Sequence, residues 1–211
     1  AVVDKIVPPL PLTSLDVIVE AYGSIILDES KKLQPLGVSK IVTYRNYDNE
    51  FYKKLWLLNG LHLQLAYYGL ANGDTYIDEV LSSKEGREFG ESAIKSLAEA
   101  YALMSNSNEN LDKFSKTIIN RFALPEIKDE VTRIARNPEI KFSKNERFEY
   151  PLRLLIANNK NIETFSKILN IVILGDFPQV EGFSSFKEVV LDKGKSNIYN
   201  DCLLYTSPSP R

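Results

Sequence analysis

The sequence predicts a mainly α-helical fold preceded by a short antiparallel β region. Up to about residue 44, short β-branched runs alternate with turn formers, which is typical of strands. From Asp48 onward, apolar residues instead recur at three- and four-residue spacing, which indicates helices. The 211 residues are 44% hydrophobic and 26% charged, so we expect a real hydrophobic core. We therefore predict a β-rich segment at residues 1–44 and one helical domain at residues 45–201.

Composition and charge exclude several classes of protein. Lys and Arg number 26 against 28 Asp and Glu, so no overall field would attract nucleic acid or an anionic membrane. The apolar stretch at residues 168–174 is interrupted by Asn170 and is far shorter than the roughly 20 residues of a membrane span. The N-terminus lacks a secretory pattern, and the single cysteine, Cys202, rules out an internal disulfide or a cysteine zinc site. We expect a cytoplasmic protein without nucleic-acid or membrane partners.

The β region consists of three expected strands. Residues 2–7 run into Pro8-Pro9, residues 15–22 run into Gly23, and the third strand covers residues 39–44. The prolines make the first connection stiff and extended, because each fixes its own φ angle.

The helical region begins with a long expected helix from an N-cap at Asp48 to Asn72-Gly73. Its apolar residues keep helical spacing at Phe51, Leu55, Leu58, Leu61, Leu65 and Tyr68. Shorter helices are predicted at residues 75–81, 85–103, 110–122, 127–135, 149–158 and 162–174.

Both ends of the sequence suggest an incomplete chain. It begins at Ala1, inside an apolar segment, rather than at Met. Residues 202–211 break the composition abruptly and resemble translated sequencing-adapter readthrough, the alternative being a natural Ser/Pro-rich disordered terminus. No GxGxxG or GxxxxGK[ST] pattern occurs, so we expect the dinucleotide site to be absent from this chain.

Three polar residues interrupt the apolar surface of the long helix. At 100° per residue, Asn59 lies about 140° and His62 about 80° around the axis from Lys54, so all three can face one cleft. Burying them together is costly unless they are paired or used, and a desolvated lysine suits acid–base chemistry. The structural alternative is that Lys54 extends to solvent, Asn59 bonds locally and His62 is a satisfied core histidine. As the only histidine, His62 excludes a multi-histidine metal site.

Three ordered motifs resemble the long-chain mannitol dehydrogenase family. Residues 54–69 fit its pattern K-x-x-x-x-N-x-x-H followed by A-Y-x-G, and residues 3–8, VDKIVP, are similar to the VDRIVP with which the family leaves its Rossmann domain. Residues 121–141 fit a third pattern through Arg121, Phe122, Pro125, Asp129, Arg133, Arg136, Pro138 and Lys141.

The resemblance implies a helical substrate domain of the 6-phosphogluconate dehydrogenase C-terminal type. It implies an NAD-dependent alcohol dehydrogenase without a metal, in which Lys54 is the general base, Asn59 holds the developing alkoxide and His62 binds a substrate hydroxyl. A second asparagine and most of the NAD site would come from the chain's own N-terminal Rossmann domain, so this chain alone is expected to be inactive. Residues 1–44 would then be the end of that domain and the link from it.

Within the family, residues 133–141 and the following Glu146, Arg147 and Pro151 look most like the mannitol-1-phosphate 5-dehydrogenase branch. This branch interconverts D-mannitol 1-phosphate and fructose 6-phosphate, and its phosphate would be bound by Arg133, Lys141 and Arg136, with Arg147 as a further candidate. For Arg136 and Arg147, the alternative is a solvated helix face or structural salt bridges.

Two other functional readings remain open. One is a sister enzyme, mannitol 2-dehydrogenase or a hexuronate reductase. The other is a non-catalytic helical interaction domain, which predicts that Lys54, Asn59 and His62 lie in different environments.

Overall fold

The protein is described from a computed structural model, in which residues 2–3, 25–28, 42–106 and 109–192 are described. The chain divides into two compact units, residues 1–54 and residues 55–211. The sequence suggested a division after Tyr44, whereas the N-terminal unit also includes the first helix.

The N-terminal unit holds a small sheet in the order β1 (Val2–Val3), β2 (Ile25–Asp28) and β3 (Val42–Arg45). β1 pairs antiparallel with β2, as expected, but β2 pairs parallel with β3, where we predicted an antiparallel region. A parallel pair needs a connection of about a dozen residues or more, and residues 29–41 supply that length. The predicted strand at residues 15–22 lies outside the described residues.

Helix α1 (Tyr47–Lys53) follows β3 and is capped by Asn46 rather than by the predicted Asp48. The Asn46 side chain accepts a hydrogen bond from the backbone N–H of Asn49 at 3.1 Å, as an N-cap does. Asp48 lies in the first turn, where its negative charge is favoured by the helix dipole.

The long helix predicted from Asp48 to Asn72 is divided in the structure. A π-helix, η2 (Lys54–Gly60), separates α1 from α2 (Leu61–Asn72). The sequence could not predict this change, because one wider turn hardly alters the spacing of apolar residues. The expected stop is confirmed, since Gly73 adopts a φ of 82°, a left-handed conformation that glycine tolerates.

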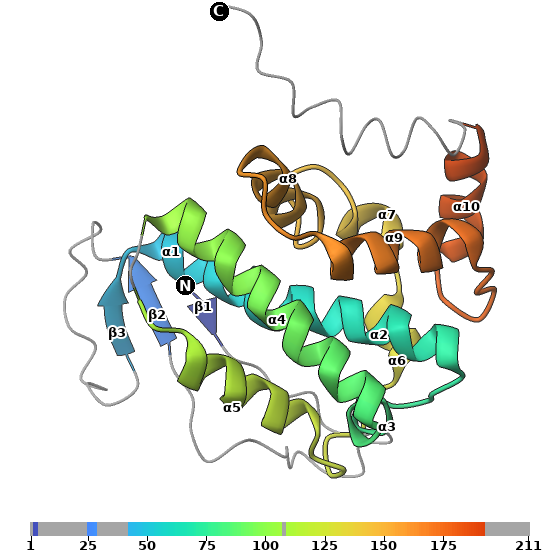
Figure 1. The fold of residues 1–211 in the computed structure, drawn as a ribbon, viewed down its shortest axis with the longest axis horizontal. Coiled ribbons are helices and arrows are strands. Elements are labelled where there is room, and N and C mark those ends of the chain that lie inside the picture. Colours follow the sequence, from blue (N-terminus) through green and yellow to red (C-terminus); the bar gives the residue numbers. More distant parts are fainter. Residues whose placement is uncertain (1, 4–24, 29–41, 107–108, 193–211) are drawn as a thin grey trace, which may run out of the picture. The chain divides into compact units, whose positions relative to one another are not determined.

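The second unit is built from helices, which confirms the predicted mainly α fold. α2 contacts α3, α4, α6 and α9, and α4 also contacts α5 and α8 (Figure 1). The fully buried side chains of α2 include Leu61, Leu65 and Tyr67, so the core is centred on this helix. The helices after α2 are α3 (Ile77–Ser82), α4 (Lys84–Ser105), α5 (Asp112–Phe122), α6 (Val131–Ala135), α7 (Pro138–Lys141), α8 (Glu149–Ala157), α9 (Glu163–Leu174) and α10 (Phe183–Asp192).

The helix predicted at residues 127–135 is wrong in its first half. Glu130 forms an isolated antiparallel bridge with Tyr76, and the backbone N–H of Ile77 donates to the Asp129 carbonyl at 3.0 Å. The N–H of Val131 donates to the Thr75 carbonyl, also at 3.0 Å. This bridge holds the residues before α6 extended against the turn after α2, so α6 begins only at Val131. The short α7 and the late α10 were not predicted.

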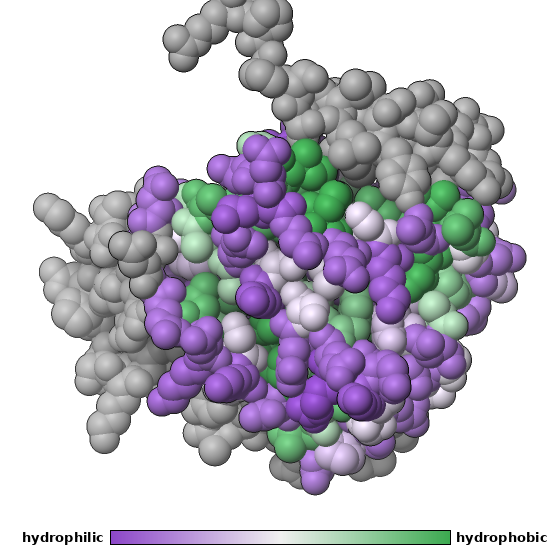
Figure 2. All heavy atoms as spheres, in the orientation of Figure 1, coloured by the Kyte–Doolittle hydropathy of each residue, from purple (hydrophilic) through white to green (hydrophobic). Residues whose placement is uncertain are grey.

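The face of the helical unit seen in Figure 2 is largely hydrophilic, with apolar residues showing between the polar ones. Within the described residues, no helix combines the length and the apolar character that a membrane crossing requires.

Candidate active site

The three polar residues predicted from the sequence lie in order along η2 and the start of α2. Lys54 is the first residue of η2 and the last residue of the N-terminal unit, and its side chain is half-buried. Asn59, also half-buried, lies at the end of η2, and His62 follows as the second residue of α2. Asn59 and His62 belong to the helical unit.

His62 is enclosed by an aromatic ring and a carboxylate. Its imidazole stacks on Phe122 of α5, with ring centroids 4.3 Å apart and an interplanar angle of 21°. Its Nε2 lies 3.3 Å from Oδ2 of Asp129, and the two side chains are 12% and 20% exposed. Burial lowers the pKa of His62 more than Asp129 raises it, while the charges of Arg133 and Arg121 lower it further. His62 is therefore a neutral imidazole at neutral pH.

Asp129 connects His62 to α6. Its Oδ1 pairs with the guanidinium of Arg133, four residues later, while Oδ2 faces His62. Burial tends to raise the pKa of Asp129, but the contacts with His62 and Arg133 outweigh it and hold the pKa below its usual value. Asp129 is thus an ionised carboxylate shared between a histidine and an arginine. No role for Asp129 was predicted from the sequence, although an acid four residues before a base is a recognisable pair within the helix predicted at residues 127–135.

Lys141 lies at the end of α7 among several positive charges. Its ammonium donates a hydrogen bond to the Ile134 carbonyl at 2.6 Å, and its side chain is half-buried. Burial, and then the charges of Arg147, Arg136 and Arg133, lower its pKa to about 8. The charges of Arg133 and Arg136, the other two cations predicted to bind phosphate, thus act on Lys141 together with that of Arg147, and Glu146 opposes them.

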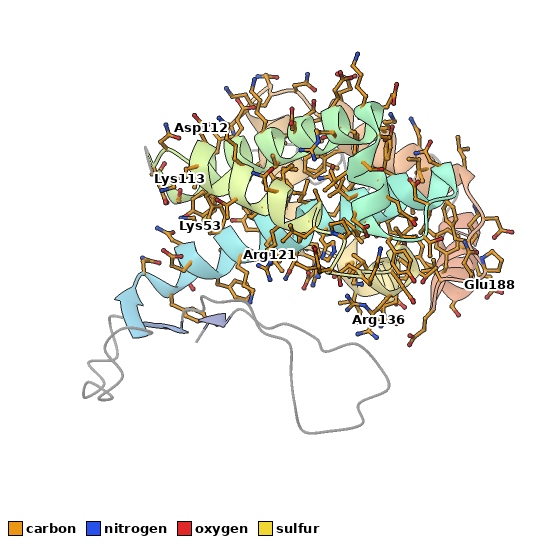
Figure 3. All side chains as sticks on the ribbon, turned by 90° about the horizontal axis from the view of Figure 1, so that it is seen from below. Lys53, Asp112, Lys113, Arg121, Arg136 and Glu188 are labelled. Atoms are coloured by element: carbon orange, nitrogen blue, oxygen red, sulfur yellow. The ribbon has the colours of Figure 1, made fainter. Side chains whose placement is uncertain are left out.

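The two arginines with alternative structural readings differ in their surroundings. Arg136 is exposed at the surface of the helical unit (Figure 3). Arg147 is half-buried, and its Nε lies 3.2 Å from Oε2 of Glu146. An ion pair thus exists at Arg147, as the structural alternative expected, alongside its position near Lys141.

Gly60 ties the polar helix to the segment that carries Arg147. A Cβ at residue 60 would lie only 2.9 Å from the backbone carbonyl oxygen of Arg147. This close approach requires glycine. The end of η2 and the turn before α8 are therefore in direct backbone contact.

The other glycines on these helices serve packing. A Cβ at Gly69 would lie 2.6 Å from a methyl of Val80, and one at Gly90 would lie 3.1 Å from a methyl of Leu81. Such filled surroundings do not fit a dinucleotide phosphate. In the described part of the chain, no group of three or more His, Cys, Asp or Glu is arranged to hold a metal ion.

Comparison with known proteins decides the family. The model of the mannitol dehydrogenase C-terminal domain matches residues 49–174, which is more than half of the chain. The chain belongs to the mannitol dehydrogenase family. Membership confirms the resemblance inferred from the three motifs.

Several relatives in this family carry the same name. The mannitol-1-phosphate 5-dehydrogenase of Mycoplasmopsis pulmonis is 32% identical over 92% of this chain and 54% of the relative. That of Streptococcus pneumoniae is 34% identical over 74% of this chain and 42% of the relative. This mannitol dehydrogenase family chain therefore spans about half the length of the curated relatives that it matches.

A solved structure supports the fold. The mannitol 2-dehydrogenase of Pseudomonas fluorescens, in a ternary complex with NAD and D-mannitol, aligns with a TM-score of 0.59 at 18% identity. The alignment covers 83% of this chain and 37% of that one. The helical architecture is thus that of the family's C-terminal domain.

Proposed function

We propose that this chain is the substrate-binding part of an NAD-dependent mannitol-1-phosphate 5-dehydrogenase, which interconverts D-mannitol 1-phosphate and fructose 6-phosphate. One observation carries the substrate class: the half-buried Lys141 lies among Arg133, Arg136 and Arg147. Asp129 and Glu146 already face Arg133 and Arg147, so the positive charge is only partly neutralised. A phosphate would neutralise the rest through charge-assisted hydrogen bonds. The names of the relatives support the same substrate.

In the proposed reaction, each of the three polar residues of η2 and α2 has its own role. Lys54 takes the proton of the hydroxyl that is oxidised, and Asn59 donates a hydrogen bond to the developing alkoxide. His62, neutral at neutral pH, accepts a hydrogen bond from a neighbouring substrate hydroxyl. NAD, when bound, would supply the acceptor for the hydride that leaves the carbon bearing this hydroxyl. In this proposal NAD is held mainly by an N-terminal domain, so the chain alone would be inactive.

The π-helix favours this division of roles. Residues five apart lie about 140° apart around an α-helix, whereas the hydrogen bonds of a π-helix join residue i to residue i+5 and bring such residues nearer to one face. Lys54 and Asn59 are five apart and both belong to η2. A base and an alkoxide donor on one face would suit a single substrate oxygen.

The test is to express the chain with its preceding coding region and to follow NADH oxidation with fructose 6-phosphate, fructose and tagaturonate in parallel. We expect fructose 6-phosphate to be the preferred substrate. Its rate of reduction should fall by several orders of magnitude in Lys54→Ala, with Lys53→Ala as the control. Turnover of only fructose or tagaturonate would assign the chain to a sister enzyme. A lack of turnover with any substrate would favour the non-catalytic domain.

A further inference from the structure

Asp129 lies against both His62 and Arg133, the two ends of the proposed site, but is not itself proposed to bind substrate. Oδ2 lies 3.3 Å from Nε2 of His62, a buried nitrogen that makes no hydrogen bond of regular geometry, and Oδ1 is paired with Arg133. The Asp129 backbone is fixed as well, because its carbonyl accepts from Ile77 N–H at 3.0 Å and its N–H donates to the Ile127 carbonyl at 2.8 Å. The carboxylate is therefore held close to both His62 and Arg133.

We propose that Asp129 is a positioning residue that fixes the tautomer of His62 and holds Arg133 at a set distance from it. A carboxylate repels a nitrogen lone pair and attracts an N–H, so we infer that the His62 nitrogen 3.3 Å from Oδ2 carries the proton. Nδ1 then keeps its lone pair and is the nitrogen left to accept a hydrogen bond from a substrate hydroxyl. The part of this inference that concerns the substrate rests on the proposed function, whereas the tautomer of His62 does not depend on it.

The ion pair with Arg133 extends the same effect to the other end of the substrate. Arg133 is one of the proposed phosphate ligands, and its guanidinium offers more donors than one carboxylate oxygen uses. Asp129 thus fixes the spacing between the nitrogen that receives a hydroxyl and the guanidinium that receives a phosphate. Such spacing selects substrates by length as well as by charge.

The direction of the electrostatic effect on His62 follows from its charged neighbours. These are Asp129 from the turn before α6, Arg133 from α6 and Arg121 from α5. Asp129 raises the pKa of His62, whereas both arginines lower it, with burial as the largest cause of lowering. Asp129→Asn therefore lowers the pKa of His62 further, because the opposing charge is lost and Arg133 loses its partner.

The first test uses the chain itself, in which His62 is the only histidine. Long-range proton–nitrogen NMR of the imidazole reports which nitrogen is protonated and follows its titration without ambiguity of assignment. We expect the Nε2–H tautomer in the wild type, and in Asp129→Asn a mixture of tautomers with a lower pKa. Glu130→Gln, which removes the adjacent exposed carboxylate, is the matched control and leaves both unchanged. An Nδ1–H tautomer in the wild type overturns the proposal, and this result needs no variant to fold.

The second test uses the longer protein that includes the preceding coding region. We expect Asp129→Asn to lower kcat/KM for fructose 6-phosphate reduction about tenfold to a hundredfold, as loss of a partner that orients a functional histidine does at metal sites. The acid limb of the pH profile moves to lower pH, which a purely structural defect would not cause. An unshifted acid limb contradicts the proposal. If the wild type does not reduce fructose 6-phosphate, the proposed function fails, and the NMR test still decides the role of Asp129.

Discussion

The protonation of a residue in the site depends on its burial and on the charges around it, and Lys141 shows this most clearly. Its folded pKa of about 8 lies below the usual 10.5. Between these two values the unfolded chain binds more protons than the folded one, so the stability contribution of Lys141 rises with pH over that window. Below pH 8 the charged ammonium is held at a cost to folding. Such a cost is typical of groups kept for binding rather than for stability.

The depressed pKa of Lys141 predicts how phosphate binding depends on pH in the longer protein. The ammonium loses its charge as the pH rises through about 8, so we expect KM for fructose 6-phosphate to increase between pH 7 and pH 9. Lys141→Arg keeps its charge throughout this range and should flatten the increase. Steady-state kinetics of the two proteins across the range measure the difference. An equal increase in both would exclude Lys141 as its source.

The sequence predicted the residues whose type conflicts with their surroundings. Lys54, Asn59 and His62 were evident because polar side chains interrupt an apolar helix. Asp129 was not, because its role depends on the bridge between Glu130 and Tyr76, which brings the turn before α6 to His62. That contact joins residues far apart in the sequence, and no local pattern encodes it.

At the scale of elements, apolar spacing predicted the type of structure better than its details. Helices α4, α5, α8 and α9 agree with their predictions to within a few residues. The π-helix was missed because α and π turns share nearly the same apolar pattern. The parallel pairing of β2 with β3 was missed because pairing direction depends on how the connection runs, which composition does not reveal.

The close approach of η2 to the turn before α8 predicts a contrast between two glycine substitutions. In Gly60→Ala the new Cβ meets a backbone oxygen at 2.9 Å, so we expect the free energy of unfolding to fall by about 1–3 kcal/mol. In Gly90→Ala the Cβ meets side-chain methyls at 3.1 Å or more, which have room to move, and helix propensity gains about 1 kcal/mol. Urea unfolding of both variants measures the contrast. Equal losses would contradict the distinction between a fixed backbone oxygen at Gly60 and movable methyls at Gly90.

At the scale of the whole molecule, the helical unit holds the residues that we propose distinguish one polyol from another. His62, Asp129, Arg133 and Lys141 all belong to this unit. The chain covers about half the length of the relatives that it matches. The mainly helical fold and the family were predictable because three motifs extend over most of the chain. The proposed substrate rests on the charges within one of those motifs.

The most direct test of the account is the ratio of kcat/KM for fructose 6-phosphate to that for fructose, measured in the longer protein and in its Lys141→Met variant. Fructose carries no phosphate, so its rate should hardly respond to the lost ammonium. A charge-assisted hydrogen bond is worth about 1.5–3 kcal/mol, so the ratio should favour fructose 6-phosphate in the wild type and fall roughly tenfold to a hundredfold in the variant. A ratio that Lys141→Met leaves unchanged would contradict the assignment of this cation cluster to a substrate phosphate.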